Sequence, residues 1–468
     1  MIVLKFGGTS VGTPESLANV KNIVESLGED AVVVVSALGG LTDRLIATAR
    51  MAAGGDSSYA AEWEAMAARH ENVVRAVIPG ADRQEATMEA IRPLLRELRR
   101  LYDGISLIAD LPGKTLAQIV SLGERMSSII VTDMIPGAVH VDSLQVVKTE
   151  KWHNRDIAAV ELTDRLIREK IPQAGGYPVI MGGFISTDRN TGEITNLGRG
   201  GSDYTAALVA AALDADVLQI WTDVDGFLTA DPRVVKDARV VGRMSFVESM
   251  DLCTFGAKVI YPPTIYPVFH KNIPIRILNT HRPEAPGTFI SDTREKRPYG
   301  RVAGISALKD EALVTLRGAM AGDATEISSR CFNALARQGL SVHLVARSSA
   351  RDSFVFAIGR GDVAAAVRLL KEEFAPELVD NQLEVIEVIE NLATLAVVGD
   401  DIRRIPGASE EIRRLLGESG IRVAAYSDKA SETSLTFVID EAGVGDAINL
   451  LHDAIYTLSV FGPQLTSD

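Results

Sequence analysis

Two short runs of β-branched residues near the N-terminus constrain the fold more than any other feature of the sequence. Residues 2–6 (IVLKF) and residues 31–36 (AVVVVS) each lead into a pair of glycines, as buried strands do when they enter a turn. The stretch between them, residues 14–27, has the spacing of a helix. Strand, helix and strand within ~35 residues form a βαβ unit, which requires a parallel sheet with helices on its faces.

The alternation of strands and helices continues to about residue 290. Residues 41–135 are predicted to be mostly helical, and residues 59–101 are expected to cover the sheet and to provide a subunit contact. Further strands are predicted at 138–142, 178–184, 216–222 and 274–278, with helices near 157–170 and 202–213. We therefore predict an α/β fold: a three-layer αβα sandwich with a mostly parallel central sheet.

A second part of the chain follows a charged, Pro- and Gly-containing linker at residues 291–301. The order βαββα then occurs twice, at a spacing near ~80 residues. Since 468 residues exceed what one core supports, we predict several domains. Their expected bounds are 1–290, 302–390 and 391–468. The strand at 302–308 could instead complete the second repeat, which would make the first repeat an insertion within it.

The bulk composition excludes several classes of partner. A formal charge of −14 disfavours nucleic acid and anionic membrane surfaces, so an anionic substrate must be held by local cations. The two cysteines, Cys253 and Cys331, lack the spacing of a disulfide framework or a metal cluster, and we expect both to be small buried residues. No apolar run has the length of a signal peptide or a membrane span. These features predict a cytoplasmic protein.

The motif Lys5-Phe6-Gly7-Gly8-Thr9-Ser10 is the first candidate for phosphate binding. Paired glycines let backbone N–H groups approach a phosphate, while a lysine at the strand end neutralises its charge. The order Gly-Lys-Ser/Thr of a Walker A loop is absent.

The motif Gly198-Arg199-Gly200-Gly201-Ser202-Asp203-Tyr204 opens the predicted helix 202–213. Glycines around an arginine at a helix N-terminus favour an anion site with a cation attached, and the guanidinium suits bidentate binding of a carboxylate. Ser202 alternatively caps the helix. Asp203 is tolerable beside phosphate when it pairs with Lys5 or with Mg²⁺.

Three further motifs are weaker. Thr222-Asp223 follows a strand at the carboxyl edge of the sheet and could serve ribose, base or magnesium, whereas Asp225-Gly226 is read as a turn. Lys258 is either a solvated lysine or a cation for a nucleotide. Glu124 either binds an ammonium group or is an exposed helix charge next to Arg125.

Taken in order, the segments KFGGTSV, SLGERMSS, GRGGSDYTAAL, WTDVDGFLTADPR and FGAKVIYP closely resemble the aspartate kinases of the amino-acid kinase superfamily. The resemblance covers residues 1 to about 290. The two βαββα repeats resemble the paired ACT regulatory modules of that family, which have the α+β order βαββαβ. The resemblance implies ATP-dependent phosphorylation of L-aspartate to 4-phospho-L-aspartate with Mg²⁺, the first step towards lysine, threonine and methionine.

The resemblance also implies roles for individual residues. Lys5 would hold the transferring phosphate, and Asp203 would organise Lys5. Arg199 would clamp a substrate carboxylate. The implied substrate-binding residues are Thr42, Glu124, Phe184, Arg199 and Ser202. The implied ATP-side residues are Lys5, Gly7, Gly8, Ser36, Thr222, Asp223, Leu228, Arg233 and Lys258. No resident metal is implied, and His153, His281 and His343 have no partners at metal-ligand spacing.

Departures from the family pattern fall mainly in the second part. Leu228 stands where the family often has Tyr, and Tyr261 where it often has His. The effector stretches begin at Arg347 and Asp428 instead of a glutamine, and lysine-sensitive relatives carry an acidic residue near His343. We expect the modules mainly to dimerise, as a homodimer or higher homo-oligomer, with lysine or threonine as the effector if one binds.

Alternative functions are a related kinase acting on another carboxylate, such as that of glutamate, and a kinase-inactive amino-acid sensor. Intact Lys5, Arg199 and Asp203 argue against the sensor. A bifunctional kinase–homoserine dehydrogenase is not expected, because no dinucleotide fingerprint follows the second repeat.

Overall fold

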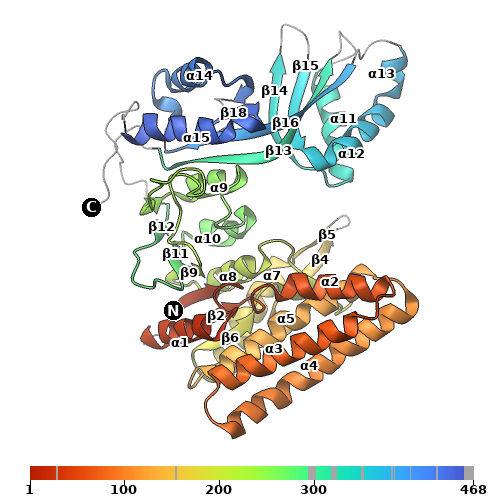
Figure 1. Cartoon of the computed structure of the whole chain (residues 1–468), viewed down its shortest axis with the longest axis vertical. Coiled ribbons are helices and arrows are strands. Elements are labelled where there is room, and N and C mark those ends of the chain that lie inside the picture. The colour runs from red at the N-terminus through yellow and green to blue at the C-terminus, as the bar shows by residue number, and fades with distance from the viewer. Residues whose placement is uncertain are drawn as a thin grey trace. The chain divides into compact units, whose positions relative to one another are not determined.

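The computed structural model describes residues 1–27, 30–152, 155–292, 302–317, 324–348, 353–380, 383, 385–400, 402–427 and 431–457. The chain divides into two compact units (Figure 1). The first unit contains Met1–Phe227, Gly242–Phe246 and Val259–Thr293. The second contains Leu228–Val241, Val247–Lys258 and Arg294–Asp468. Most of the linker predicted at 291–301 lies outside the described residues.

An eight-stranded sheet forms the centre of the first unit. Neighbouring strands are parallel except for the pair β11–β12, which confirms the predicted mostly parallel sheet. In order across the sheet, the strands are β10 (Arg243–Met244), β12 (Thr288–Ile290), β11 (Ile275–Asn279), β9 (Val217–Thr222), β1 (Ile2–Phe6), β2 (Ala31–Val35), β6 (Val179–Gly182) and β3 (Val139–His140).

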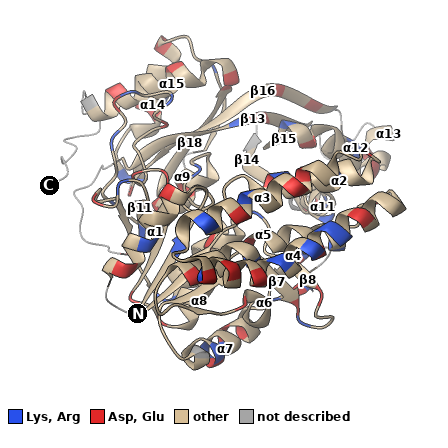
Figure 2. Ribbon diagram, turned by 60° about the horizontal axis from the view of Figure 1, so that its bottom comes forward, with Lys and Arg blue, Asp and Glu red and all other residues tan. Residues whose placement is uncertain are grey.

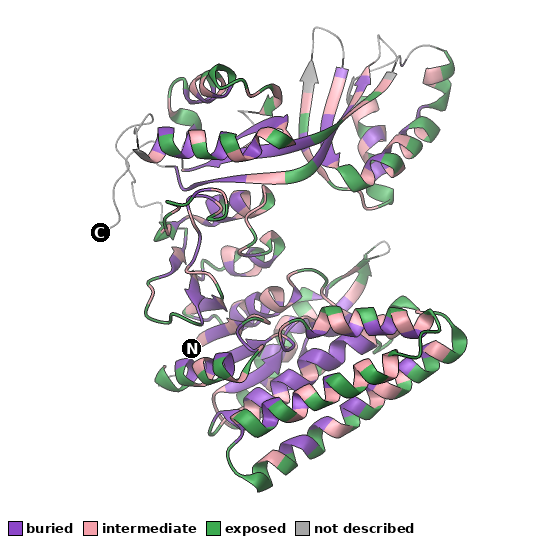
Figure 3. Cartoon of the chain, in the orientation of Figure 1, coloured by how far each residue is buried: buried purple, intermediate pink, exposed green. Residues whose placement is uncertain are grey.

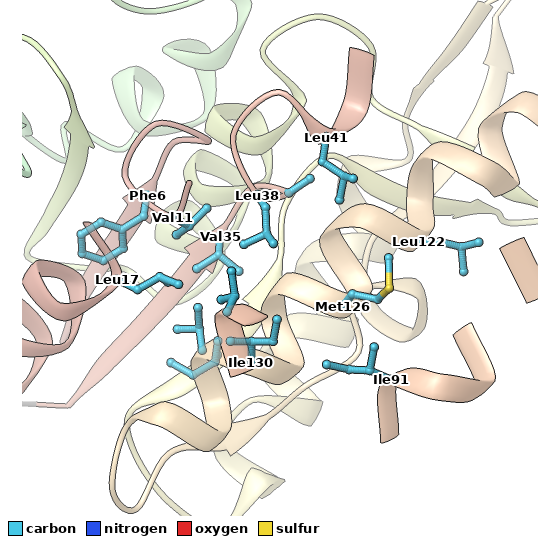
Figure 4. Packing of buried hydrophobic residues seen from close by; sticks show 14 of the residues in the cluster. Phe6, Val11, Leu17, Val35, Leu38, Leu41, Ile91, Leu122, Met126 and Ile130 are labelled. Carbon is cyan, nitrogen blue, oxygen red and sulfur yellow. The ribbon is translucent and has the colours of Figure 1, made fainter. Parts of the chain in front are cut away.

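Five helices cover one face of this sheet: α1 (Pro14–Ser26), α2 (Leu41–Ala53), α3 (Tyr59–Val77), α4 (Ala81–Ile108) and α5 (Gly113–Met134). Their apolar residues pack against Leu4 and Phe6 of β1 in one buried cluster, part of which Figure 4 shows. Helix α8 (Gly201–Ala212) contacts β1, β2 and β9, and its buried residues lie outside that cluster, so it covers the opposite face. The fold is thus the predicted αβα sandwich.

The long helices α3 and α4 bury one side and expose the other (Figure 3). Acidic and basic residues alternate along their outer surfaces (Figure 2), with ion pairs such as Arg92–Glu85 and Arg99–Asp103. This pattern is that of helices covering a sheet. The predicted subunit contact through residues 59–101 stays a prediction.

The first unit also contains a four-stranded sheet, whose strands at residues 148–152 and 155–158 were missed in the sequence. It has the order β5 (Arg155–Ala158), β4 (Lys148–Trp152), β7 (Ile185–Asp188), β8 (Ile194–Asn196). The helix predicted near 157–170 begins only at Val160, as α7 (Val160–Lys170), because residues 155–158 pair with β4. Strands β4 and β5 are rich in charged residues and half exposed, so they lack the apolar alternation that indicates a strand. Helix α6 (Ser143–Val146) precedes them.

The second unit is built on a six-stranded antiparallel sheet. Its strands, in order, are β14 (Val342–Ser348), β15 (Ser353–Gly359), β13 (Gly304–Arg317), β16 (Val385–Val398), β18 (Ser434–Asp440) and β17 (Val423–Ser427). Its main helices are α11 (Ala324–Arg337), α12 (Val363–Glu373), α14 (Ala408–Glu418) and α15 (Val444–His452). The two halves of the sheet carry one βαββα repeat each, as predicted.

Strands β13 and β16 each run through both repeats without a break. Residues 304–308 pair with residues 394–398 of the second repeat, whereas residues 311–317 pair with 385–392 and with β15 of the first. The predicted boundary between residues 390 and 391 therefore lies inside a continuous strand. The exact module bounds stay predictions.

Helix α9 (Phe246–Thr254) lies mostly in the second unit, although the chain places it between strands of the first. Asp251 Oδ2 accepts hydrogen bonds from Ser431 Oγ (2.8 Å) and Thr433 Oγ1 (2.6 Å). The buried Glu248 accepts one from the amide of Asp400 (2.9 Å). These carboxylates fix the helix to the second ACT-like repeat.

Candidate active site

A cavity of about 410 Å³ opens in the first unit at the carboxyl ends of β1, β2 and β6. In parallel sheets, ligands bind at this edge. Four loops, the N-terminal ends of α2 and α8, and Glu124 of α5 form the walls. The lining residues are Lys5, Gly8, Ser36, Ala37, Leu38, Gly40, Thr42, Asp43, Glu124, Phe184, Gly198, Arg199, Gly200, Gly201, Ser202 and Asp203.

Lys5 and Asp203 form an ion pair at one wall of the cavity, with Nζ and Oδ1 2.6 Å apart. Their side chains are only 11% and 13% exposed. Lys5 lies on β1 between β2 and β9, where the ladder on both sides fixes its backbone. Asp203 lies in the first turn of α8. The sequence offered Lys5 or Mg²⁺ as the partner of Asp203, and in the structure Asp203 pairs with Lys5.

The glycines of the second motif let the start of α8 approach its neighbours closely. Gly200 has φ +68°, and a Cβ atom there would lie 2.3 Å from the Cβ of Tyr261. A Cβ on Gly201 would lie 2.7 Å from the ring of Phe184. Gly200 is the N-cap of α8, so the alternative that Ser202 caps the helix is wrong. The Ser202 hydroxyl instead accepts a hydrogen bond from Ser36 Oγ (3.0 Å).

Glu124 lies on α5 and is only 3% exposed, so the alternative of an exposed helix charge is wrong. Burial raises the pKa of Glu124 to about 8, and hydrogen bonding to the backbone of Ala37 only partly offsets this. Its Oε2 atom has no hydrogen-bond partner within the described residues. A buried carboxylate with an unused acceptor, facing a cavity, is suited to a cationic group of a ligand.

Arg199 and Phe184 line the cavity beside the start of α8. Arg199 is exposed and forms no ion pair with any described residue, so its guanidinium is available to an anion. Phe184 has φ +67°, a costly conformation for a residue other than glycine. Hydrogen bonds from its amide to Thr205 Oγ1 (3.0 Å) and from the amide of Leu197 to its carbonyl (2.9 Å) hold it there.

The remaining predicted ATP-side residues do not line this cavity. Gly7 donates its amide to the carbonyl of Trp221 (3.2 Å), and Thr222 Oγ1 donates to Asp223 Oδ1 (3.2 Å), both within the first unit. Asp225 accepts a hydrogen bond from Asn279 Nδ2 (2.7 Å), and its interpretation as a turn residue stays a prediction.

The other three, Leu228, Arg233 and Lys258, belong to the second unit. Leu228 forms an isolated bridge with Val240. Arg233 forms an ion pair with Asp231 at 2.7 Å, and Lys258 is exposed.

Sequence reasoning missed four lining residues: Ala37, Leu38, Gly40 and Asp43. They belong to the turn after β2 and the start of α2, and the glycine pair in this turn was the available signal. The described residues contain no group of three His, Cys, Asp or Glu side chains that could hold a metal. His153 lies outside the described residues.

Comparison with known proteins assigns this architecture to a family. Residues 1–279 match the model of the amino acid kinase family, and residues 314–374 and 395–455 match an ACT domain. The lysine-sensitive aspartokinase 3 of Escherichia coli is 31% identical, covering 97% of this chain and 99% of that protein. The crystal structure of E. coli aspartokinase III in complex with aspartate and ADP superposes with a TM-score of 0.84 at 29% identity, covering 97% and 100% of the two chains. The chain belongs to the amino acid kinase family, and within it to the aspartokinases.

The chain also matches longer relatives. The bifunctional aspartokinase/homoserine dehydrogenase of Haemophilus influenzae is 33% identical over 97% of this chain, which spans 56% of that protein. The chain thus covers little more than half the length of this relative. In the part of the chain that the structure describes, no helix combines the length and apolarity needed to cross a bilayer.

Proposed function

We propose that this chain transfers the γ-phosphoryl group of ATP to the side-chain carboxylate of L-aspartate, giving ADP and 4-phospho-L-aspartate. The observation that carries the proposal is one cavity holding the Lys5–Asp203 ion pair at one point and the buried, unpaired carboxylate of Glu124 at another. The anionic phosphates of ATP require a cation such as the Lys5 ammonium. The α-ammonium group of an amino-acid acceptor requires a carboxylate such as that of Glu124.

The reaction brings two anions together, so the main task of the site is charge neutralisation and alignment. A carboxylate nucleophile is ionised at neutral pH and requires no general base. Lys5 would neutralise the transferring phosphoryl group while Asp203 holds its ammonium in place. Backbone amides at Gly8 and at the N-terminus of α8 would add positive partial charge, which the helix dipole reinforces.

The acceptor would be oriented by contacts at both of its ends. Glu124 would bind the α-ammonium group in its ionised form, and Arg199 would hold a carboxylate in bidentate fashion. Thr42, Ser202 and the backbone of Phe184 would complete the contacts, since all three line the cavity. Fixing the acceptor at two charged ends would place its side-chain carboxylate towards Lys5.

The nucleotide would extend from the phosphate site to the predicted ATP-side residues. These are Gly7, Gly8, Ser36, Thr222, Asp223, Leu228, Arg233 and Lys258. Mg²⁺ usually binds through one or two carboxylates together with substrate phosphates, so the ion would enter the site together with ATP. When bound, the ion would neutralise charge on the phosphate oxygens.

We further propose that the second unit binds an amino-acid effector, lysine or threonine, and that the chain acts as a homodimer or higher homo-oligomer. The ACT-domain match supports effector binding, as does the similarity to the lysine-sensitive aspartokinase 3 of E. coli. The stretch at Asp428 lies outside the described residues. Inhibition assays and thermal shifts with lysine, threonine and methionine would identify the effector, and light scattering would give the oligomeric state.

The test of catalysis is ADP formation with L-aspartate and with L-glutamate, each with and without Mg²⁺. We expect Mg²⁺-dependent turnover with L-aspartate and at least ~10²-fold lower kcat/KM with L-glutamate, because in an acceptor held at Glu124 and Arg199 an extra methylene would displace the reacting carboxylate. Preference for L-glutamate would move the protein to another kinase activity. Absence of turnover with either acceptor, in a folded protein that binds ATP, would favour an inactive sensor.

A further inference from the structure

Arg69 on helix α3 connects the outer helices to the two glycine turns of the cavity. Its Nη2 atom donates one hydrogen bond to the carbonyl of Gly12 (3.0 Å) and another to the carbonyl of Gly39 (2.8 Å). Gly12 ends the turn that follows β1, and Gly39 lies in the turn that follows β2. A single guanidinium therefore holds two loops that are 27 residues apart in the chain.

The two turns pack backbone against backbone where Arg69 binds them. A Cβ atom on Gly39 would lie 2.9 Å from the carbonyl oxygen of Gly8, and one on Gly12 would lie 3.5 Å from the Cα of Gly39. Within the described residues, no backbone amide donates to the carbonyl of Gly12 or of Gly39. Without Arg69, both half-buried carbonyls would lose a donor and the glycine contact would lack a cross-link.

Both turns carry groups that line the candidate active site. The first turn contributes Gly8 and continues directly from Lys5, which places it on the phosphate side. The second contributes Ala37, Leu38 and Gly40 and leads to Thr42, on the acceptor side. The spacing between the two turns thus sets the spacing between donor and acceptor contacts.

We propose that Arg69 is a positioning residue for phosphoryl transfer: by binding the carbonyls of Gly12 and Gly39 together, it fixes the distance between the phosphate-binding and acceptor-binding turns. This inference rests on the proposed kinase function. Arg69 does not line the cavity, so it acts through the turns and not by contact with substrate. The guanidinium is half-buried, and this burial lowers the pKa of Arg69, though arginine stays charged at physiological pH.

The test compares Arg69→Met with Arg75→Met. Arg75 lies on the same helix, its side chain is 66% exposed, and it forms a surface ion pair with Glu71. For Arg69→Met we expect kcat to fall at least ~10-fold while KM for ATP and L-aspartate change less than ~3-fold, because each turn keeps its own contacts and loses only its spacing. Arg75→Met should have wild-type kcat and KM.

Two further measurements separate positioning from packing. Arg69→Lys should restore part of kcat, and low millimolar guanidinium should raise kcat of Arg69→Ala but not of wild type. Hydrogen exchange in peptides covering residues 7–13 and 36–41 should be faster in Arg69→Met than in wild type or Arg75→Met, whether or not the protein turns over aspartate. Unchanged exchange in both peptides would overturn the positioning role, and an inactive wild type with altered exchange would refute only the kinase assignment. A lowered Tm with unchanged kcat per active site would show that Arg69 merely packs α3.

Discussion

The two sheets of this protein organise their loops in opposite ways. In the first unit, parallel strands β1, β2 and β6 end at the same edge, so residues as distant in sequence as Lys5, Glu124 and Asp203 line one cavity. In the second unit, neighbouring strands are antiparallel, so successive strands end at opposite edges of the sheet. Chemistry therefore concentrates in the first unit, while the second repeats a packing pattern. The predictions below test this division.

The largest effect is expected from Lys5→Ala. Removal of the ammonium leaves the phosphoryl group and Asp203 without their cation, so kcat should fall by on the order of 10³-fold or more. Circular dichroism should show an intact fold. Lys21→Ala, on the exposed side of α1 with a partner 3.9 Å away, is the matched control. Near-normal kcat in Lys5→Ala would remove the central observation on which the kinase assignment rests.

A pH profile tests the acceptor end of the cavity. Because burial raises the pKa of Glu124 to about 8, the free site holds a largely neutral carboxyl at pH 6, and binding of an ammonium group requires its ionisation. The kcat/KM for L-aspartate should rise about tenfold per pH unit from pH 6 towards pH 8 and then level off.

The variant Glu124→Gln should lose this pH dependence and about 10²-fold of kcat/KM for L-aspartate at pH 8, with KM for ATP little changed. The control is wild-type kcat/KM for ATP at saturating L-aspartate, measured across the same pH range. A wild-type profile for L-aspartate that is flat from pH 6 to pH 8 would exclude Glu124 as the ammonium-binding group.

Stability should respond to acid in the first unit. His70 on α3 is fully buried, its Nδ1 faces the carbonyl of Met66 (2.8 Å), and burial lowers its pKa to about 4 from 6.5. The unfolded chain takes up this proton below pH 6.5, whereas the folded chain does so only near pH 4, so stability falls as pH drops through this window. The loss from pH 7 to pH 4 is on the order of 3 kcal/mol.

Urea unfolding followed by tryptophan fluorescence measures this effect, because all three tryptophans lie in the first unit. His70→Gln should flatten the acid dependence of the midpoint by the corresponding amount. His270→Gln, an exposed histidine of the same unit, should leave it unchanged. An equal acid dependence in all three proteins would show that His70 is not the titrating group.

The second unit should respond to pH in the opposite direction, by a smaller amount. Glu311, 1% exposed in β13, accepts hydrogen bonds from His343 Nδ1 (2.8 Å) and Thr394 Oγ1 (3.2 Å), and the bond to Glu311 raises the pKa of His343. This contribution is complete below pH 6.5 and is lost as pH rises through the folded pKa. Hydrogen exchange of β13 and β14 should therefore accelerate above pH 6.5 beyond the intrinsic rate.

Glu311→Gln should abolish the acceleration of hydrogen exchange above pH 6.5 and leave kcat unaltered in the absence of effector. The control Glu387→Gln alters an exposed carboxylate on the neighbouring strand β16 and should behave as wild type. If Glu311→Gln lowers kcat as strongly as a change in the cavity does, the division of labour between the two units is wrong.

How far the sequence predicts the site depends on whether a signal is local. Lys5 and Arg199 stand in glycine-rich motifs whose composition already indicates an anion site, and both line the cavity. Glu124 could not be decided locally, because only the packing of α5 against other elements buries it. Arg69 carried no signal at all, since the two carbonyls that it binds belong to other segments.

The same distinction applies to the fold. Strands β1 and β2 are fully predicted from their β-branched runs, which are buried on both faces. The hairpin of β4 and β5 was missed because its charged residues keep no apolar alternation, and its pairing to β7 is a long-range contact. The attachment of α9 to the second unit likewise depends on carboxylates that meet their donors 152 residues or more along the chain.

The long strands β13 and β16 join the two repeats of the second unit. Both strands extend through the two repeats, and the ladder between them shifts register between Leu308 and Leu313, where the repeats meet. In the order of the sheet, β13 and β16 lie between the β14–β15 pair of the first repeat and the β18–β17 pair of the second. Cleavage of the chain at residue 390 would cut strand β16 in its interior, and we expect neither fragment to fold by itself.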